Sequence, residues 1–559
     1  MAINRLVPVV SIVWAIAFLM AVPHAAQQQP PRPGTAPSAV NPHPESLFTP
    51  SENCVACHNV LVTPSGEDVS IGATWRSTMM ANSGRDPYWQ AGVRRETIDH
   101  PMQADAIQAE CAACHMPMLQ KVSKAAGKKT DVFAQLPINK KDDSELHKLA
   151  ADGVSCTVCH QISDEGLGTR ENFNANFTLR PTPPDGNRVI FGPYQIDAGR
   201  KTIMRSATGF QQMKATHIQQ SELCATCHTL YTEVLTPAGQ VAGSFPEQMN
   251  FQEWQHSSYS QGSNAQSCQA CHMPEVKEKT RIASVLGDVR EGLHRHLFVG
   301  GNAFVVRMLN RYRRDLGVTA LSSELEATAK ATIRQLQEDT ATVSIARSDL
   351  AAGKLTVDVD VKNLAGHKFP TGYPARRTWL HFTVRDGDGR AVFDSGAVTD
   401  AGLIRGNDND ADPLKYEPHY DEITSPDQVQ IYEPILGDAS NMPTTGLLFA
   451  THYLKDNRLL PRGFDKTTAD KDIGVYGGAM QDSNFTGDGD RIRYVVEVPP
   501  RGGPYRVDVQ LMYQSIGFRW AHNLEKYDAL EPKRFVEYYN AMAHESAVIV
   551  ANASTQAGP

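Results

Sequence analysis

The chain has 559 residues, of which 41% are hydrophobic, and its formal net charge is −8. This length and composition allow two or three domains with ordinary buried cores, which excludes a globally disordered protein. The acidic balance argues against a nucleic-acid-binding protein, because such a domain normally carries a basic face.

Residues 1–26 are predicted to form an export signal. Arg5 supplies the positive charge, residues 6–22 are almost entirely apolar, and small alanines precede residue 27. An uncleaved membrane anchor is the alternative, although the apolar run is short for a helix that spans a bilayer. We therefore expect a periplasmic or otherwise extracytoplasmic protein, with membrane contact only through such an anchor. Residues 27–48 are rich in Pro and predict a flexible spacer.

All ten cysteines belong to Cys-x-x-Cys-His motifs between residues 49 and 300. The five motifs are Cys54/Cys57/His58, Cys111/Cys114/His115, Cys156/Cys159/His160, Cys224/Cys227/His228 and Cys268/Cys271/His272. Ten cysteines in an exported protein would by default form disulfides, but a His after every pair is typical of covalent haem attachment. Zinc sites usually combine two Cys-x-x-Cys units, and five units cannot be paired evenly.

The spacing suits one haem c per motif. Two thiols separated by two residues can reach one porphyrin edge as thioethers, and the next residue can turn under the ring as proximal ligand. We therefore predict five covalently bound haems, with all ten cysteines as attachment points and the five motif histidines as proximal iron ligands. Apolar periodicity is weak over residues 49–300, which predicts a haem-packed domain of short helices and irregular loops.

A second ligand on each iron would make it low-spin and suited to electron transfer. The candidate distal ligands are His100, His147, His217, His296 and His367, with Met80, His256 and His294 as alternates. His367 stands apart, in the turn-rich segment NLAGHKFPTGYP, and is interpreted either as a structural turn residue or as a ligand that joins two domains. Met79 and Met80 could instead pack against a porphyrin.

The pattern changes downstream of the motifs. Residues 301–350 are predicted to form a helical connector, with a helix over residues 321–345. Residues 351–552 are predicted to form a β-sandwich, with the immunoglobulin-like arrangement as one form. The stretches KLTVDVDVKN, IRYVVEVP and YRVDVQLMYQSI alternate, and TWLHFTVRDGDGRAVFDSG predicts a hairpin. A last helix is expected over residues 531–542, and residues 553–559 are expected to form a tail.

Three aspartates, Asp408, Asp410 and Asp412, have the alternating spacing of calcium ligands. The glycine and the final glutamate of an EF-hand loop are missing, and Pro413 and His419 stand in their places. Ca²⁺ is therefore a disfavoured second cofactor.

The haem region resembles multihaem cytochromes of the c-552/c-554 type. The resemblance lies in the five motifs, in WRSTMMANSGRDPYW between the first two, and in EWQHSSYSQ before CQACHMP. The segment GHKFPTGYPARRTW resembles a β-domain appended to many bacterial multihaem cytochromes, in which such a His is often a haem ligand; this favours His367. The related pentahaem nitrite reductases mark their catalytic haem with Cys-x-x-Cys-Lys, whereas all five motifs here end in His. The crosslinking Tyr of hydroxylamine oxidoreductases is also not recognisable.

The resemblance therefore implies a fold and a cofactor but not those activities. The favoured hypothesis is an electron carrier of a respiratory or other extracytoplasmic pathway, with redox proteins as donor and acceptor. An oxidoreductase is the alternative, with one open haem that acts on a small nitrogen or sulfur compound. A structural subunit of a haem conduit is the third hypothesis.

Overall fold

The structure is a computed structural model that describes residues 47–558, except 181–185, 237 and 500–501. The predicted export signal and almost all of the predicted spacer lie outside the described residues. All of the described residues belong to one compact unit. Among the described helices, none is both long enough and apolar enough to cross a membrane.

Short helices and small sheets make up the part of the chain that carries the motifs. The helices are α1 (Glu52–Val55), α2 (Ile71–Trp75), α3 (Pro87–Asp99), α4 (Ala104–His115), α5 (Pro117–Ala125), α6 (Glu145–Ala151), α7 (Cys156–Cys159), α8 (Ala198–Thr208), α9 (Ser221–His228), α10 (Asn250–Gln255) and α11 (Cys268–His272). The strand pairs are β1 (Arg188–Gly192) with β2 (Phe210–Lys214), β3 (Thr229–Leu235) with β4 (Val241–Met249), and β5 (Thr280–Arg281) with β6 (Val289–Arg290). The prediction of short helices around the motifs is confirmed.

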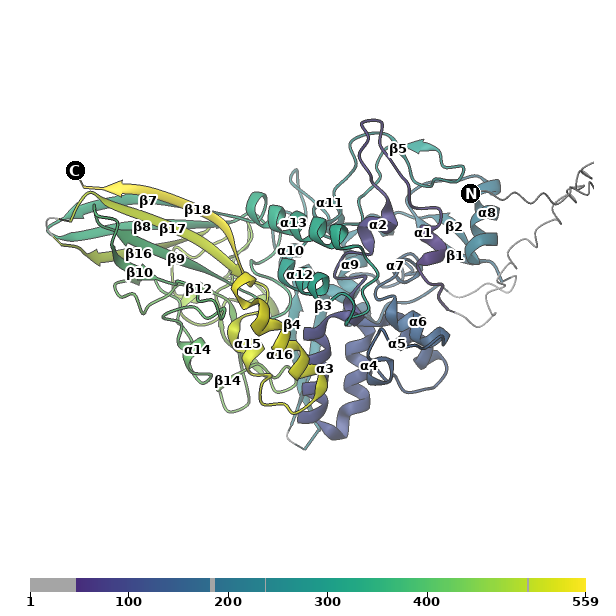
Figure 1. Cartoon of the computed structure of the whole chain (residues 1–559), viewed down its shortest axis with the longest axis horizontal. Helices are drawn as coiled ribbons and strands as arrows, with labels where there is room; N and C mark the ends of the chain where they lie inside the picture. The colour runs from purple at the N-terminus through teal and green to yellow at the C-terminus, as the bar shows by residue number, and fades with distance from the viewer. Residues whose placement is uncertain (1–46, 181–185, 237, 500–501, 559) are drawn as a thin grey trace, which may run out of the picture. The chain divides into compact units, whose positions relative to one another are not determined.

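The longest helix of this region, α3, has a clear start signal. The Asp86 carboxylate accepts a hydrogen bond of 2.9 Å from the backbone N–H of Tyr88, and Pro87 occupies the first turn, where its missing N–H is harmless. The next helix, α4, ends at His115 and so delivers the second motif. The two helices lie side by side (Figure 1).

The predicted connector contains two helices, α12 (Ala303–Arg311) and α13 (Ser322–Glu338). The helix expected over residues 321–345 is too long, because the chain turns into strand β7 (Ala341–Ala351). The β-branched residues Thr342, Val343 and Ile345 favour a strand there. The helix therefore ends at Glu338, seven residues earlier than expected. The last helix, α16 (Leu530–Met542), agrees with the prediction.

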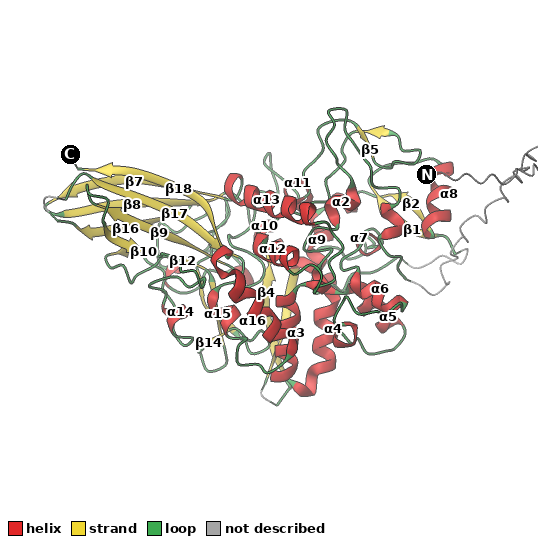
Figure 2. Cartoon of the chain, in the orientation of Figure 1, coloured by secondary structure: helices red, strands yellow, loops and turns green. Residues whose placement is uncertain are grey.

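Two sheets account for most of the strands after residue 340 (Figure 2). One has the order β10–β9–β17–β18, with β12 beside β9, and the other has the order β11–β16–β8–β7. Their bounds are β8 (Lys354–Asn363), β9 (Arg377–Arg385), β10 (Ala391–Ser395), β11 (Glu422–Ile423), β12 (Ile431–Tyr432), β16 (Asp490–Glu497), β17 (Tyr505–Gln514) and β18 (Ala547–Ala557). A smaller sheet joins β13 (Pro434–Gly437), β14 (Pro443–Thr444) and β15 (His452–Asp456).

Alternate residues of the two large sheets bury their side chains in one hydrophobic cluster. Val357 of β8 and Val507 of β17 are fully buried in it. The rings of Phe382 on β9 and Tyr494 on β16 stack across it, with centroids 3.8 Å apart. The hairpin predicted by the Asp-Gly-Asp-Gly turn is confirmed by the pairing of β9 with β10.

The end of the chain differs from its prediction. Residues expected to form a tail belong to β18, which pairs with β17 from Ala547 to Ala557. Alanine and serine have little strand propensity by themselves, so the pairing with β17 decides their conformation. In the sequence between β17 and β18, α16 packs against α3, where Glu531 binds Arg94 at 2.8 Å.

Candidate functional site: the cysteine–histidine motifs

Each motif lies in or at the end of a short helix, and none of the ten cysteines forms a disulfide. Cysteines of different motifs lie close to one another. The side chain of Cys54 is close enough to Cys156 to shift its pKa, and the same holds for Cys114 with Cys227 and for Cys224 with Cys268. These contacts lower the pKa of Cys54, Cys227 and Cys268, the last to about 7. The first motif therefore lies against the third, and the fourth lies against both the second and the fifth.

Four motif histidines orient their rings in the same way. Nδ1 of His58 lies 2.6 Å from the Ile282 carbonyl oxygen, and Nδ1 of His160 lies 2.6 Å from that of Phe191. The rings of His272 and His115 contact the carbonyls of Val299 and Ser83 through Nδ1 as well. A carbonyl oxygen can only accept, so Nδ1 donates and the lone pair is on Nε2. This is how a metal-binding histidine is commonly oriented.

Burial acts on the same rings. It lowers the pKa of His115 and of His228 to about 4, and it also lowers the pKa of His58, His160 and His272. A buried ring with a low pKa stays neutral at physiological pH, which is the state that can bind a metal.

Two motif histidines face a second imidazole. The ring centroids of His160 and His296 are 6.5 Å apart with planes inclined by 19°, and those of His272 and His367 are 6.2 Å apart with planes inclined by 9°. Two metal–nitrogen bonds of about 2 Å in line, with each nitrogen about 1 Å from its ring centroid, place two centroids about 6 Å apart. The centroid separation in both pairs is therefore compatible with two imidazoles that bind one metal atom.

The two facing rings share the tautomer of the motif histidines. Nδ1 of His296 contacts the His294 carbonyl oxygen at 3.0 Å, and Nδ1 of His367 contacts that of Lys368 at 2.9 Å. Nε2 is left with its lone pair in both. The turn-rich segment NLAGHKFPTGYP thus places the imidazole of His367 beside that of the fifth motif.

The remaining candidates are arranged differently. Nε2 of His147, His217 and His256 lies against the carbonyl oxygens of Ile138, Ile162 and Asp465, at 3.1, 2.9 and 3.1 Å. Those three rings therefore keep only Nδ1 for a metal. His294 directs Nδ1 to the Met273 carbonyl oxygen at 2.6 Å and keeps Nε2. Within the described residues, no second imidazole stacks opposite His58, His115 or His228 as in the two pairs.

His100 and Met80 have other surroundings. His100 is buried, and its Nε2 lies 4.0 Å from Glu96 without a hydrogen-bond partner among the described residues. The main-chain oxygen of Met80 accepts a hydrogen bond of 2.9 Å from the Val154 N–H. Neither residue faces a motif histidine in a ring contact, and their roles as ligands stay predictions.

A buried ionic network holds the segment that carries His367. Lys368 binds Asp456 at 2.8 Å, Arg458 binds Asp456 at 2.7 Å, and Arg458 also binds Glu253 at 2.9 Å. Glu253 lies on α10 and accepts a hydrogen bond of 2.6 Å from the hydroxyl of Thr371. Two positive and two negative charges thus compensate one another inside the protein. The sequence gives no local signal for this network, because its members come from three distant segments.

A cavity opens at the first motif. Cys54, Cys57 and His58 line one part of its wall, and α8 lines another with Met204. Sequence reasoning overlooked this methionine because it considered methionines only between the first two motifs. The sequence feature that could have identified it is the apolar face of α8, on which Ile203, Met204 and Ala207 follow helical spacing.

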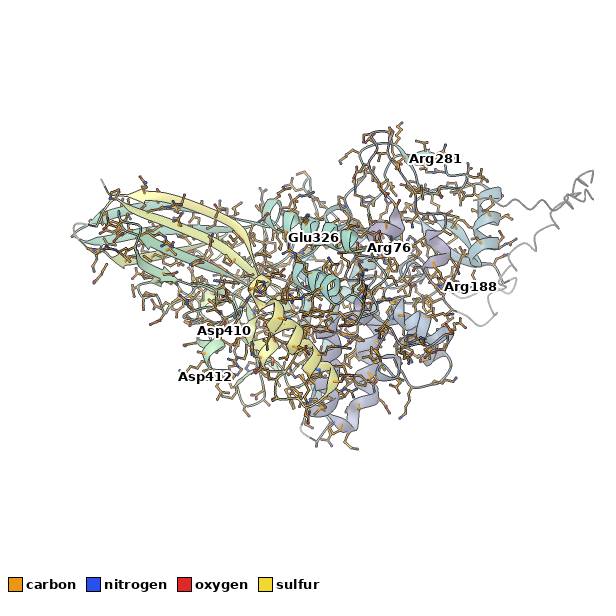
Figure 3. All side chains as sticks on the ribbon, viewed as in Figure 1. Arg76, Arg188, Arg281, Glu326, Asp410 and Asp412 are labelled. Atoms are coloured by element: carbon orange, nitrogen blue, oxygen red, sulfur yellow. The ribbon has the colours of Figure 1, made fainter. Side chains whose placement is uncertain are left out.

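The aspartates considered for calcium do not converge on a cation site. Asp410 lies on α14 (Asp408–Ala411) (Figure 3). Both its carboxylate oxygens bind Arg377, at 2.7 and 2.9 Å. Asp412 accepts a hydrogen bond of 3.0 Å from the Leu414 N–H. The buried guanidinium supplies the positive charge that a cation would otherwise supply.

His419, Asp482 and Asp490 form another cluster of potential metal ligands. Nδ1 of His419 accepts hydrogen bonds from the side-chain amides of Gln430 and Asn457, at 2.9 and 3.1 Å. The proton is therefore on Nε2, which lies 3.1 Å from Asp482. A ring nitrogen that carries a proton has no lone pair for a metal, so this cluster is a hydrogen-bonded core.

Comparisons with known proteins add little. No protein-family model matches the chain, and no curated protein sequence matches it. A solved structure, described as the crystal structure of a penta-heme cytochrome c552 from Thermochromatium tepidum, is 16% identical, with a TM-score of 0.49. The match covers 92% of this chain and 100% of that one. Because its TM-score is below 0.5, this likeness establishes neither a shared fold nor a shared function.

Proposed function

We propose that the protein is an exported pentahaem cytochrome c that transfers electrons between redox proteins. The ten motif cysteines would hold five haems through thioethers, and the five motif histidines would bind the irons. Haem c supplies one-electron chemistry when it is bound, and its potential is set by the axial ligands and by burial. The periplasm or another extracytoplasmic compartment is the proposed location.

The pairs His160/His296 and His272/His367 are the observation that carries this proposal. The centroid spacing in both pairs suits two imidazoles on one metal atom, and all four rings keep the lone pair on Nε2. Two imidazoles on one iron give a low-spin, six-coordinate centre, which favours electron transfer over binding of a substrate. The shared tautomer supports this reading, because a ring that only filled space would have no reason to keep Nε2 unoccupied.

The contacts between cysteines support an order for the attachment sites. The first site would neighbour the third, the third would neighbour the fourth through Cys159 and Cys227, and the fourth would neighbour both the second and the fifth. This order has a continuous path with a branch at the fourth motif. Closely spaced attachment sites are what a carrier requires, and the path would admit and release electrons at different ends.

We also propose that the two large sheets form a β-sandwich domain. The shared hydrophobic cluster and the stacked pair Phe382/Tyr494 support it. The role of this domain would be to present His367 to the fifth haem from a rigid scaffold, which the network of Lys368, Asp456, Arg458 and Glu253 anchors.

Low-temperature EPR of the oxidised holoprotein, with optical quantitation of haem, tests this function. The proposal expects five haems per chain and low-spin signals from the sites of His160 and His272. A protein whose haems are all high-spin and bind external ligands would contradict the carrier function.

A second candidate function is an oxidoreductase with one open haem. Near the second motif, Arg95 Nε, Glu96 Oε2 and His100 Nε2 are buried without a hydrogen-bond partner among the described residues. Burial raises the pKa of Cys111, and the negative charges of Glu96 and Glu247 raise it further. Both carboxylates therefore lie close to the second motif. Burial also raises the pKa of Glu247 itself to about 7, the range of a proton donor. A high-spin haem that responds to nitrite or hydroxylamine, and no longer does so in Arg95→Met, would favour this candidate.

A further inference from the structure

We propose that Met204 is the distal ligand of the haem bound by Cys54, Cys57 and His58, which would give this haem His–Met coordination. The inference rests on the proposed function, because it requires haem attachment at the first motif. It assigns a ligand to one of the three motif histidines that face no second imidazole.

The cavity at the first motif has the wall of a cofactor site. The atoms that line it are almost entirely apolar, as in most pockets that hold a cofactor. The motif residues line it together with α8 and with the segment from Ile282 to Arg290. Two attachment cysteines and the proximal histidine of the first motif lie in this wall. The haem of the first motif is therefore the inferred occupant of the cavity.

The helix α8 forms one wall of this cavity. It starts at Asp197, whose carboxylate accepts a hydrogen bond of 3.0 Å from the Arg200 N–H, and it ends at Gly209 with φ +79°. None of its eleven residues is buried, although Ile203, Met204 and Ala207 give it an apolar face. The helix lies beside α1, β1 and β2 (Figure 1). An apolar helix face that stays partly exposed towards a cavity indicates an absent apolar partner, and a porphyrin would provide one.

The lining residues leave one strong candidate for the second iron ligand. Apart from the motif residues, Met204 is the one lining residue of a type that commonly binds haem iron. The two arginines of the wall are engaged: Arg200 binds Asp288 at 2.6 Å and the Leu286 carbonyl oxygen at 2.7 Å, and Arg290 binds Asp288 at 3.1 Å. The cavity therefore offers no free cationic group for an anionic substrate, which favours an internal ligand over an open face.

The test uses the full-length holoprotein and three variants. Near-infrared magnetic circular dichroism separates His–Met from bis-His coordination, and a potentiometric titration resolves the haem potentials. Met204→Leu removes the sulfur and retains the apolar bulk, and Met204→His replaces one iron ligand by another. Met102→Leu is the matched control, because Met102 is 84% exposed.

We expect the wild-type protein to show one His–Met haem, at a higher potential than the bis-His haems. Met204→Leu should abolish that signal, Met204→His should convert it to a bis-His signal at lower potential, and Met102→Leu should change neither. Absence of a His–Met signal from the wild-type protein, or its persistence in Met204→Leu, would overturn the inference. The proposed function would survive either result if five haems were still counted, and it would fail with the inference only if the haems themselves were missing.

Discussion

The imidazole rings of His272 and His367 lie almost parallel, with centroids 6.2 Å apart, although 94 residues separate them in the sequence. Each directs Nδ1 to a backbone carbonyl and keeps the lone pair on Nε2. This relationship joins the fifth motif to the C-terminal sheets and makes the proposed ligand set testable residue by residue.

Removal of the distal imidazole should change a single haem. In His367→Ala, the haem at His272 should become five-coordinate and high-spin, while the other haems keep their spectra, because only that iron loses a ligand. EPR and resonance Raman spectroscopy check this. His544→Ala is the control, since that side chain is 56% exposed and its ion pair is at the surface. Unchanged spectra in His367→Ala would show that His367 does not bind the iron opposite His272.

The buried network should position His367. Lys368→Met leaves Asp456 with Arg458 as its remaining cationic partner, and loss of one member of a buried ion pair typically costs about 3–5 kcal/mol. We expect a lower midpoint of denaturation, together with a broadened or partly high-spin signal from the haem at His272. Lys415 is exposed, so the control variant Lys415→Met should leave the midpoint of denaturation and the haem signal unchanged. A destabilised variant with an unaltered haem signal would show that the network stabilises the fold without orienting the ligand.

The same network should make the protein sensitive to acid. Burial opposes ionisation of Asp456, but Arg458 and Lys368 outweigh it and lower the pKa of this carboxyl to about 2, from an unfolded value of about 4. A lowered folded pKa gives stability above the unfolded pKa, which is lost as the pH falls towards 2. This contribution to the free energy of unfolding is roughly 3 kcal/mol. Chemical denaturation between pH 6 and 2 measures it, and Asp456→Asn should flatten this part of the profile.

The core of the two large sheets should be independent of the haem sites. Phe382→Ala removes a buried ring that stacks on Tyr494, which costs about 3–5 kcal/mol for a large aromatic residue. The haem spectra below the unfolding transition should not change, because Phe382 lies in the cluster between the sheets. Spectral changes at low denaturant would mean that the sheets and the motifs are coupled more tightly than their contacts suggest.

Local signals in the sequence predicted local structure well. The Asp-Gly-Asp-Gly turn between β9 and β10, the helix α16 and the helical setting of each motif all depend on neighbouring residues. The end of α13 and the strand β18 were mistaken, because pairing with distant strands decides both. His367 was one of several candidate distal ligands, and the sequence did not indicate that it would lie opposite His272. Contacts between residues so far apart in the chain are not encoded in the spacing of the motifs.

The same limit applies to the candidate site. The motif composition predicts cofactor attachment, but the contact between Cys54 and Cys156, and hence the order of the sites, depends on how the loops fold. The network around Glu253 and the cavity beside Met204 were missed for the same reason.

The intact mass of the purified protein under denaturing conditions tests the central claim most directly. Covalent attachment at every motif predicts a mass that exceeds the processed polypeptide by five haems, with the loss of one haem in a variant such as Cys268→Ala/Cys271→Ala. A polypeptide mass without haem, or one reduced by disulfide formation between the ten cysteines, would contradict the account.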